Sequence, residues 1–370
     1  MPSDRVLKTP RDDHPFRENG GTQAPRSHPV FANPAVVAEG WVPACPKGAV
    51  RPGRALSVLL TWQRVVIWRG ADGTLRALDA FCPHMGADLG NGRVRGDDLE
   101  CYFHQWRFGG DGCLKSARCS GPLPRVRTRA WPVAEKYGWI WVHAGDTPSH
   151  PIPDAPGLEG GEVLAWHLAS PLLFAHHHVM MAGGIDLQHF ASVHDFDVAF
   201  DLQVRDRGQN VVDFVLRGSL PSRGGWRVRL GRWLLGDHFG YDARFAGGSV
   251  VALTYGPEQR FGGRGRRLPP LHILWGCVAE QTGVSRVHVF LLTRRRRGLW
   301  GALGSRLLLL ATAALLSVLR DDDVEAFPHM RFQLGPLLEA DHAVARLVRF
   351  LDGLPLSPWS RSGRDPKAGP

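Results

Sequence analysis

The chain has 370 residues, of which 44% are hydrophobic and 22% charged, which is ordinary for a globular protein and allows two domains. Six cysteines are too few for a disulfide scaffold. Lys and Arg total 45 against 35 Asp and Glu, and the resulting net charge of +10 suits an anionic membrane surface or an acidic protein partner. No nucleic-acid-binding motif accompanies the charge, so we expect no nucleic-acid partner.

Residues 1–33 are rich in Pro, Arg and Asp and poor in apolar residues, so we expect a disordered arm. They contain no apolar segment of the kind found in secretory signal peptides.

Residues 34–146 predict a small all-β domain built from short strands and glycine-containing turns. The runs 56–62 and 65–68 predict one hairpin, Asp72-Gly73 predicts the next turn, and 138–143 predicts a closing apolar strand.

Two pairs of metal-ligand residues lie within this region, Cys82-x-His84 and Cys101-x-x-His104. Two thiolates and two imidazoles at this spacing can hold one metal centre between two loops, and Gly109–Gly112 predicts a hairpin turn directly after the second loop. Pairing of CxH with CxxH is the pattern of a Rieske [2Fe–2S] cluster, in which two histidines replace two cysteines on one iron and raise the reduction potential.

A zinc site is the alternative for these four residues. Zinc ribbons prefer CxxC pairs, or CxxC followed by HxxxH, and the spacing here matches neither. The sequence therefore favours the Rieske cluster, and because oxidants damage such a cluster, we expect a cytoplasmic protein.

Residues 147–161 contain four prolines and predict a linker, and 356–370 predict a loose, disordered tail. Between them, 162–355 predict a second domain of α+β class, with a large antiparallel sheet and helices on one side. Its expected elements are a helix near 183–195, strands at 210–217, 226–230, 249–255, 272–279 and 285–292, and an apolar helix at 299–319.

A second metal site is predicted at the helix near 183–195. Asp186 precedes His189 by three residues, and His194 follows His189 by five. Residues i and i+5 lie about 140° apart on a regular helix, so both histidines can face one metal only if the helix ends, tightens or bulges between them. Two histidines and a distant carboxylate form the facial triad of non-haem Fe(II) oxygenases. The carboxylate is expected among Asp321, Asp322 and Asp323.

These motifs occur in the order seen in Rieske non-haem iron oxygenases, and the chain resembles their catalytic α subunit across residues 35–350. Residues 103–112 and 322–331 are similar to the branch that contains ketosteroid 9α-hydroxylases and cholesterol 7-desaturases. The departures are Gly183 in place of an Asn, Tyr102 in place of a Pro, and Ala326-Phe327 in place of the Ile-Trp of the late motif. The resemblance implies a helix-grip catalytic domain, with the cluster held by Cys82, His84, Cys101 and His104 and the mononuclear Fe(II) by His189, His194 and Asp323.

The resemblance also implies that Asp186 links a ligand histidine to a cluster histidine of the neighbouring subunit in a ring-shaped homotrimer. The expected reaction uses O2, and electrons from an NAD(P)H-dependent reductase or a ferredoxin, to hydroxylate or desaturate a C–H bond of an apolar, sterol-like substrate. O-demethylation, oxidative cyclisation of a natural product, and a non-catalytic Rieske electron-transfer protein are the alternatives.

Two further features carry weaker expectations. His176-His177-His178 would alternate faces on a strand, so at most His176 and His178 would cooperate, and a non-ligand role is favoured. The helix at 299–319 follows four arginines, 294–297, and is expected to be buried, with insertion into a membrane surface and a full membrane span as the alternatives.

Overall fold

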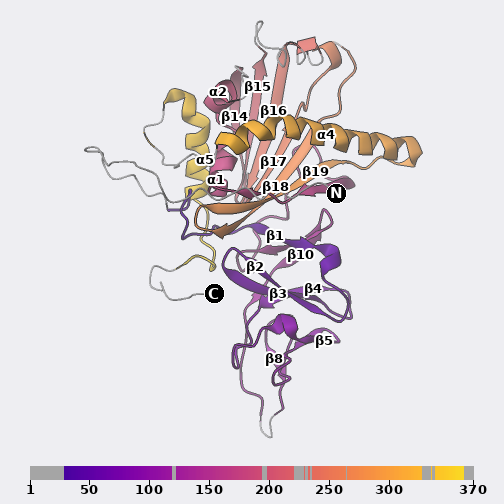
Figure 1. The fold of residues 1–370 in the computed structure, drawn as a ribbon, viewed down its shortest axis with the longest axis vertical. Helices are drawn as coiled ribbons and strands as arrows, with labels where there is room; N and C mark the ends of the chain where they lie inside the picture. Colours follow the sequence, from indigo (N-terminus) through magenta and orange to yellow (C-terminus); the bar gives the residue numbers. More distant parts are fainter. Residues whose placement is uncertain are drawn as a thin grey trace, which may run out of the picture.

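The structure is a computed structural model. It describes residues 29–118, 122–193, 198–220, 229, 232–233, 236–263, 265–326, 335 and 338–361, and within these ranges the side chains of 199, 315, 318–326 and 339 lie outside the description. Figure 1 shows two parts, a group of small sheets at one end and a large sheet with helices at the other.

The first part contains three small antiparallel sheets. Its elements are β1 (Trp41–Pro46), η1 (Lys47–Ala49), β2 (Ala55–Leu60), β3 (Gln63–Arg69), β4 (Leu75–Asp79), η2 (Leu89–Asn91), β5 (Arg93–Arg95), β6 (Asp98–Glu100), β7 (Arg107–Phe108), β8 (Leu114–Ser116), β9 (Ala130–Trp131), β10 (Val133–Lys136) and β11 (Trp139–His143). The sheet orders are β1-β11-β10, β2-β3-β4-β9 and β5-β6-β7-β8. The predicted hairpin is confirmed as β2–β3, with Thr61 in the left-handed region at the turn.

The second part is one eight-stranded antiparallel sheet in the order β12-β19-β18-β17-β16-β15-β14, with β13 paired to β19. Its strands are β12 (Val163–Ala169), β13 (Leu172–Leu173), β14 (Ala199–Gly208), β15 (Val211–Ser219), β16 (His238–Ala246), β17 (Val250–Tyr255), β18 (Leu271–Gln281) and β19 (Val284–Arg294). The helices are α1 (His177–Gly183), α2 (Leu187–Ser192), η3 (Phe261–Gly263), α4 (Gly298–Ala326), η5 (Glu339–Asp341) and α5 (His342–Asp352).

Alternation along β15 shows how the sheet separates its two faces. Phe214 and Leu216 pack with α1 and α5 in one hydrophobic cluster. Asp213 points to the opposite face, where it accepts from Arg244 Nε at 2.7 Å. That opposite face also packs against the first part of the chain, since Trp41 and Trp141 share a cluster with Leu274 of β18. The expected α+β architecture is confirmed.

Helix α4 and helix α1 both cover the β18–β19 end of the sheet. Leu309, Ala313 and Leu316 of α4 belong to the same hydrophobic cluster as Met180 of α1. The expected apolar helix at 299–319 is thus present in a longer form. Within the described residues, none of the helices combines the length and the hydropathy that a bilayer span requires.

Several boundaries differ from expectation because apolar side chains at the ends of the chain are buried. Val30 and Phe31, expected in the disordered arm, join the core of the large sheet, and their amides donate to Asp352 Oδ1. In the expected loose tail, Trp359 is 2% exposed and packs edge-on against Trp131. The expected linker contains Ala155, which is fully buried. Residues 1–28 and 362–370 lie outside the described residues.

The expected single helix near 183–195 is two helices, α1 and α2, with a break at 184–186. Strands β12, β13, β14 and β16 had not been expected, whereas β15, β17, β18 and β19 match expected strands to within two residues. The expected strand at 226–230 is outside the described residues except for position 229.

Candidate metal centres

The two loops that carry the predicted cluster ligands share one hydrogen-bond framework. In the first loop, Cys82 N donates to Ala87 O and Gly86 N donates to Cys82 O, both at 2.8 Å. In the second loop, Cys101 N donates to Trp106 O at 2.8 Å and Gln105 N to Cys101 O at 3.0 Å. Each loop therefore closes by the same two bonds, from residue i to i+5 and from i+4 to i.

The same position of each loop adopts the left-handed conformation. It is Gly86 in the first loop, with φ of 74°, and Gln105 in the second, with φ of 57°. Glycine adopts this conformation without steric cost, whereas glutamine is held in it by the surrounding bonds. Histidine stands at i+2 in one loop and at i+3 in the other, so the loops are alike in backbone but not in side-chain order.

The loops bring the four predicted ligands together. Cys82 and Cys101 are buried in one hydrophobic cluster with Leu89. His84 and His104 are exposed, and their ring centroids lie 4.7 Å apart. The two thiols therefore lie at the inner end of the site and the two imidazoles at the outer end.

The donor set fits an iron–sulfur centre. Burial, with lesser effects that include the charge of Cys101, raises the pKa of the Cys82 thiol to about 11. A buried thiol of this kind becomes a thiolate only when a cation binds it. The Cys2His2 set from two matching loops is the set of a Rieske centre. The zinc alternative has no further support, because its CxxC pairs are absent from the sequence.

Sequence reasoning missed the aromatic residues that pack against these imidazoles. The Trp106 indole stacks on His84 with centroids 4.2 Å apart and 8° between the planes. The Phe103 ring lies 4.1 Å from that of His104. The signal was present in the sequence, since both aromatic residues lie within two positions of His104.

Asp186 begins the helix that carries the predicted iron ligand His189. Its Oδ1 accepts from the backbone amides of Gln188 at 3.0 Å and His189 at 3.2 Å, so Asp186 is the N-cap of α2. The predicted contact between Asp186 and His189 is present, but it runs through the backbone of His189. No hydrogen bond between described residues uses Asp186 Oδ2 in the structure.

The helix ends between the two predicted histidine ligands, as their spacing required. Val193 N donates to His189 O at 2.9 Å as the C-cap of α2. His194 lies outside the described residues. Asp321, Asp322 and Asp323 belong to the last turns of α4, but the structure describes only their backbone. The described residues thus place His189 on a short capped helix and the three aspartates on a helix that covers the same sheet face.

The break between α1 and α2 is fixed to the sheet by Tyr241. Its hydroxyl donates to Gly184 O at 2.9 Å. Burial raises the pKa of Tyr241 well above its ordinary value, so the phenol keeps its proton for this bond. The bond holds the segment directly before Asp186 against β16.

An aromatic surface adjoins His189 on the helix-covered face of the sheet. Phe190 of α2 lies 5.6 Å from Tyr241 and 6.1 Å from Phe200, measured between ring centroids. Tyr255 stacks on Tyr241 at 5.7 Å. The neighbourhood of the predicted iron is therefore apolar and aromatic, which suits an apolar substrate.

The three adjacent histidines do not lie on a strand. His176 is the N-cap of α1, and His177 and His178 are its first residues, which brings ligand atoms of all three within 4.8 Å of one another. The prediction that at most two could cooperate is therefore wrong, because a helix start does not alternate faces.

Hydrogen bonds nevertheless favour a structural role for these histidines. The Nε2 atoms of His177 and His178 both lie about 3 Å from Gly248 O. His178 Nδ1 accepts from Ala32 N at 3.0 Å. Both nitrogens of His178 are therefore occupied, and His178 has no lone pair left for a metal.

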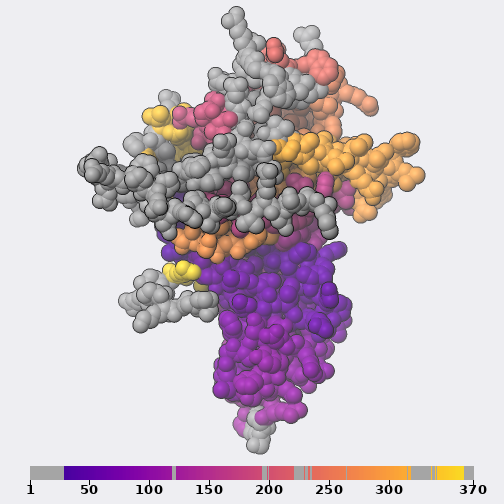
Figure 2. Space-filling model, viewed as in Figure 1, coloured from indigo at the N-terminus to yellow at the C-terminus, as the bar shows by residue number. Residues whose placement is uncertain are grey.

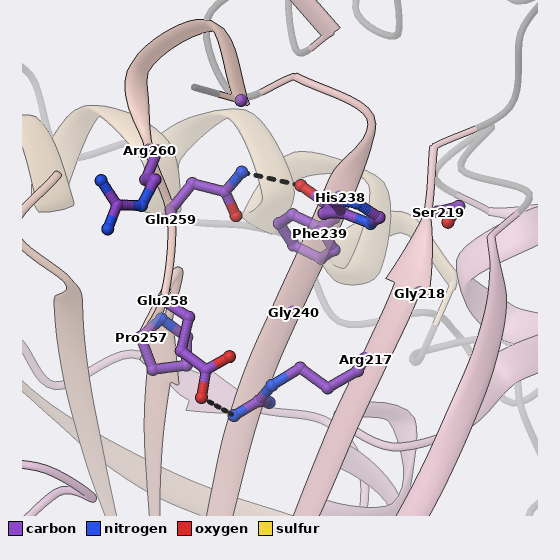
Figure 3. Close-up of a pocket in the computed structure, with 11 residues that line it drawn as sticks. Arg217, Gly218, Ser219, His238, Phe239, Gly240, Pro257, Glu258, Gln259 and Arg260 are labelled. Carbon is purple, nitrogen blue, oxygen red and sulfur yellow. Dashed lines mark hydrogen bonds and ion pairs between the residues drawn. The ribbon is translucent and has the colours of Figure 1, made fainter. Parts of the chain in front are cut away.

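A cavity of about 510 Å³ opens at the ends of β15 and β16 (Figure 3). Its charged lining groups include Arg217 and Glu258, with Arg217 Nη2 4.0 Å from the Glu258 carboxylate. Arg217 alternates with Leu216, which faces the helices, so its guanidinium lies on the opposite face of the sheet from α2. Phe239 also lines the cavity but packs with the helix-side cluster, so the cavity opens at the edge of the sheet, beside both faces.

Comparison with known proteins agrees with the motifs. A family model for the Rieske [2Fe–2S] domain matches residues 40–128. The chain is 34% identical over 170 residues to the 3-ketosteroid-9-alpha-monooxygenase oxygenase component of Mycolicibacterium smegmatis, covering 44% of each protein. It is 35% identical over 171 residues to cholesterol 7-desaturase nvd of Bombyx mori, covering 45% of this chain and 37% of the relative. The matches thus span less than half the length of these curated relatives.

Solved structures extend the likeness to most of the fold. NdmB of Pseudomonas putida CBB5 matches with a TM-score of 0.62 and 16% identity, covering 84% of this chain and 89% of the other. Dicamba monooxygenase bound to dicamba matches with a TM-score of 0.56 and 17% identity, covering 87% and 97%. The expected resemblance is confirmed at this level: residues 40–128 match the Rieske [2Fe–2S] domain, and the chain shares its fold with these two solved structures over 84–87% of its length.

Proposed function

We propose that this chain is the oxygenase component of a Rieske-type system that hydroxylates or desaturates a C–H bond of an apolar, sterol-like substrate. The proposal rests on one observation above all. Two matched loops place Cys82, His84, Cys101 and His104 together, and the same chain carries a second domain with His189 on a capped helix beside an aromatic surface.

Cys82, His84, Cys101 and His104 would hold the cluster, and His189, His194 and Asp323 would hold the iron. When bound, the two groups supply one-electron transfer and activation of O2, respectively. Asp186 would both cap α2 through Oδ1 and leave Oδ2 to accept from a histidine of a neighbouring subunit. The half-buried rings of Phe190, Phe200 and Tyr255, which pack around the buried Tyr241, would contact the substrate and exclude water from it.

The arrangement of the chain favours an assembly of several copies. The first cluster loop follows β4 and the second joins β6 to β7, whose sheet, with β5 and β8, lies at the end of the molecule away from α2 (Figure 1). His84 and His104 are exposed there and are flanked by large apolar side chains that are more than half exposed, namely Phe81, Met85, Tyr102 and Phe103. A head-to-tail homotrimer would bring this surface of one copy to α2 of the next.

An NAD(P)H-dependent reductase or a ferredoxin would supply the electrons. Arg54, Arg93 and Arg95 are exposed near the cluster end, and they would steer an acidic partner to it. Reduction of the cluster should then slow as NaCl is raised, and a rate independent of salt would contradict the steering role.

Iron content and complementation test the whole proposal. We expect about three irons per wild-type chain and about two in His189→Ala, which should keep the visible spectrum of the cluster. Cys82→Ser and His189→Ala should each be inactive with sterols and a surrogate reductase. When the two variants are refolded together, a ring in which electrons pass between subunits should recover about a quarter of wild-type turnover.

The alternatives give different results. A Rieske electron-transfer protein would hold about two irons in the wild type and show no turnover. Transfer within one chain would leave the mixture of variants inactive. O-demethylation or oxidative cyclisation would appear as products from methoxy or alkyl-chain substrates while sterols remain unchanged.

A further inference from the structure

The N-terminal half of α4 projects beyond the edge of the large sheet, where Figures 1 and 2 show it as an orange extension of the molecule. Leu299 and Trp300 at its start are 91% and 85% exposed. Leu303, Leu307 and Leu310 follow and are each about half exposed. Large apolar side chains are thus presented to solvent over three turns of one helix.

These five side chains form one stripe. At about 100° of rotation per residue, positions 299, 300, 303, 307 and 310 fall within an arc of about 100°. The buried side chains Ser305, Leu309 and Thr312 lie on the opposite side of the helix. The side of α4 that packs on the sheet is therefore already buried. The five exposed side chains, which we call the leucine stripe, form a second apolar surface with no role in that packing. Contiguous exposed apolar surfaces of this kind usually mark a site of interaction.

A rigid basic segment borders the leucine stripe. Arg294, Arg295, Arg296 and Arg297 are all exposed. Ser305 Oγ donates to Arg294 O at 3.1 Å and lies 3.3 Å from Arg296 N, from which it accepts. The segment is thus bound to the second turn of α4 and is not a free loop.

Gly301 admits the arginine segment to this position beside the stripe. A Cβ at Gly301 would lie 2.9 Å from Arg296 Cβ, closer than two such carbons can approach. Among the described residues, no carboxylate forms an ion pair with Arg295, Arg296 or Arg297. Three guanidinium groups therefore remain available for an external anion.

We propose that the leucine stripe and Arg295–Arg297 form a docking surface for an anionic lipid bilayer. Leucines at the start of the helix would enter the boundary between headgroups and acyl chains, and Trp300 would sit at the headgroup level that tryptophan prefers. The arginines would bind lipid phosphates, which an apolar helix face alone cannot attract.

Charge favours a bilayer over a second copy of this chain. A two-fold contact through the same surface would bring two sets of unpaired arginines together, and like charges in a desolvated contact are unfavourable. An anionic bilayer neutralises the same arginines while it covers the leucines. Neither the leucine stripe nor Arg295–Arg297 contains a predicted ligand of the cluster or of the iron. The proposal is therefore independent of the reaction assigned above.

Vesicle sedimentation of the iron-loaded, full-length protein tests the proposal. We expect binding to phosphatidylcholine vesicles that contain roughly 30% phosphatidylglycerol, at least tenfold weaker binding to phosphatidylcholine alone, and loss of binding at high salt. Leu299→Ser/Leu303→Ser should weaken binding by about tenfold or more. The control is Leu59→Ser/Leu172→Ser, which changes two leucines elsewhere that are 55% and 45% exposed and which should bind as the wild type does.

A second pair of variants tests the arginines. Arg295→Gln/Arg296→Gln/Arg297→Gln should lower the affinity about 100-fold. Arg51→Gln/Arg118→Gln/Arg125→Gln removes the same net charge from exposed positions on the other domain and should have little effect. Trp300→Phe should abolish the blue shift of tryptophan emission that vesicles cause in the wild type.

Each variant must keep the melting temperature and the visible spectrum of the wild type. If Leu299→Ser/Leu303→Ser proves unstable, Leu299→Ser alone serves, because that side chain is 91% exposed. Equal losses in the two arginine variants, or full binding by the leucine variant, would overturn the proposal. Absence of vesicle binding would also overturn the proposal. If the leucine variant then had a smaller molar mass in solution than the wild type, the surface would be assigned to contact between copies of the chain.

Discussion

The indole of Trp106 stacks on the imidazole of His84 at 4.2 Å with 8° between the two planes, across the gap between the two cluster loops. Each loop is closed by its own hydrogen bonds, and this stack is a contact that joins one loop to the other. It orients His84 toward His104 and shields one face of its ring.

Trp106→Ala should therefore weaken retention of the cluster without unfolding the domain. Aromatic pairs contribute about 0.5–1.5 kcal/mol beyond their buried area, so cluster loss to a chelator should be up to roughly tenfold faster. Trp106→Phe should restore much of the stability. Tyr102→Ala, in the same loop but more than half exposed, is the control. Visible absorption followed over time measures the loss, and equal rates in Trp106→Ala and wild type would contradict the prediction.

Substitutions of Asp186 should separate its two roles. Asp186→Ala removes the N-cap of α2 and should cost about 1 kcal/mol of local stability, seen as faster hydrogen exchange at the Gln188 and His189 amides. Asp186→Asn keeps a capping oxygen, so exchange should remain slow. Turnover should fall in both variants if the carboxylate also serves electron transfer. Full activity in Asp186→Asn would show that Asp186 acts as a cap only.

Stability should fall in acid because buried histidines are held neutral. Burial lowers the pKa of His177 to about 4 and that of His178 well below its ordinary value, while unfolding returns both to about 6.5. The unfolded chain then binds more protons below pH 6.5, so the free energy of unfolding decreases as the pH falls from 6.5 toward 4. With its pKa lowered from about 6.5 to about 4, His177 contributes about 2.5 kcal/mol to the loss by pH 4.5.

His177→Gln should flatten this dependence while keeping a donor for Gly248 O. Urea unfolding at pH 7 and pH 4.5 measures it, with the exposed His238→Gln as the matched control. His272 and His288, whose pKa values burial also lowers to about 4, should preserve part of the acid sensitivity. An identical pH slope in His177→Gln and wild type would disprove the assignment.

Trp359 should be required for stability although it lies near the end of the chain. It is almost fully buried, packs against Trp131, and its carbonyl accepts from Trp62 Nε1. Trp359→Ala should cost about 3–5 kcal/mol, whereas Leu356→Ala, at a half-exposed position, should cost far less. Denaturant unfolding compares the two. A loss below about 1 kcal/mol for Trp359→Ala would mean that the tail is dispensable.

The sequence determined the elements whose signals are local. CxH and CxxH predicted the two loops, Asp72-Gly73 and Gly109–Gly112 predicted tight turns, and apolar runs predicted β17, β18 and β19. Each of these depends on backbone preferences or ligand spacing within a few residues. The spacing of His189 and His194 predicted that the helix would end, tighten or bulge between them, and in the structure α2 ends there, with Val193 as its C-cap.

Tertiary structure decided what depends on residues far apart in the chain. Val30 is ordered because Asp352 accepts from its amide, and Trp359 because Trp131 lies beside it. His178 has no lone pair for a metal because Ala32 and Gly248 occupy its two nitrogens. No window of sequence contains both partners of such contacts, so composition could predict only a loose arm and tail, and burial by distant segments ordered residues 29–33 and 356–361.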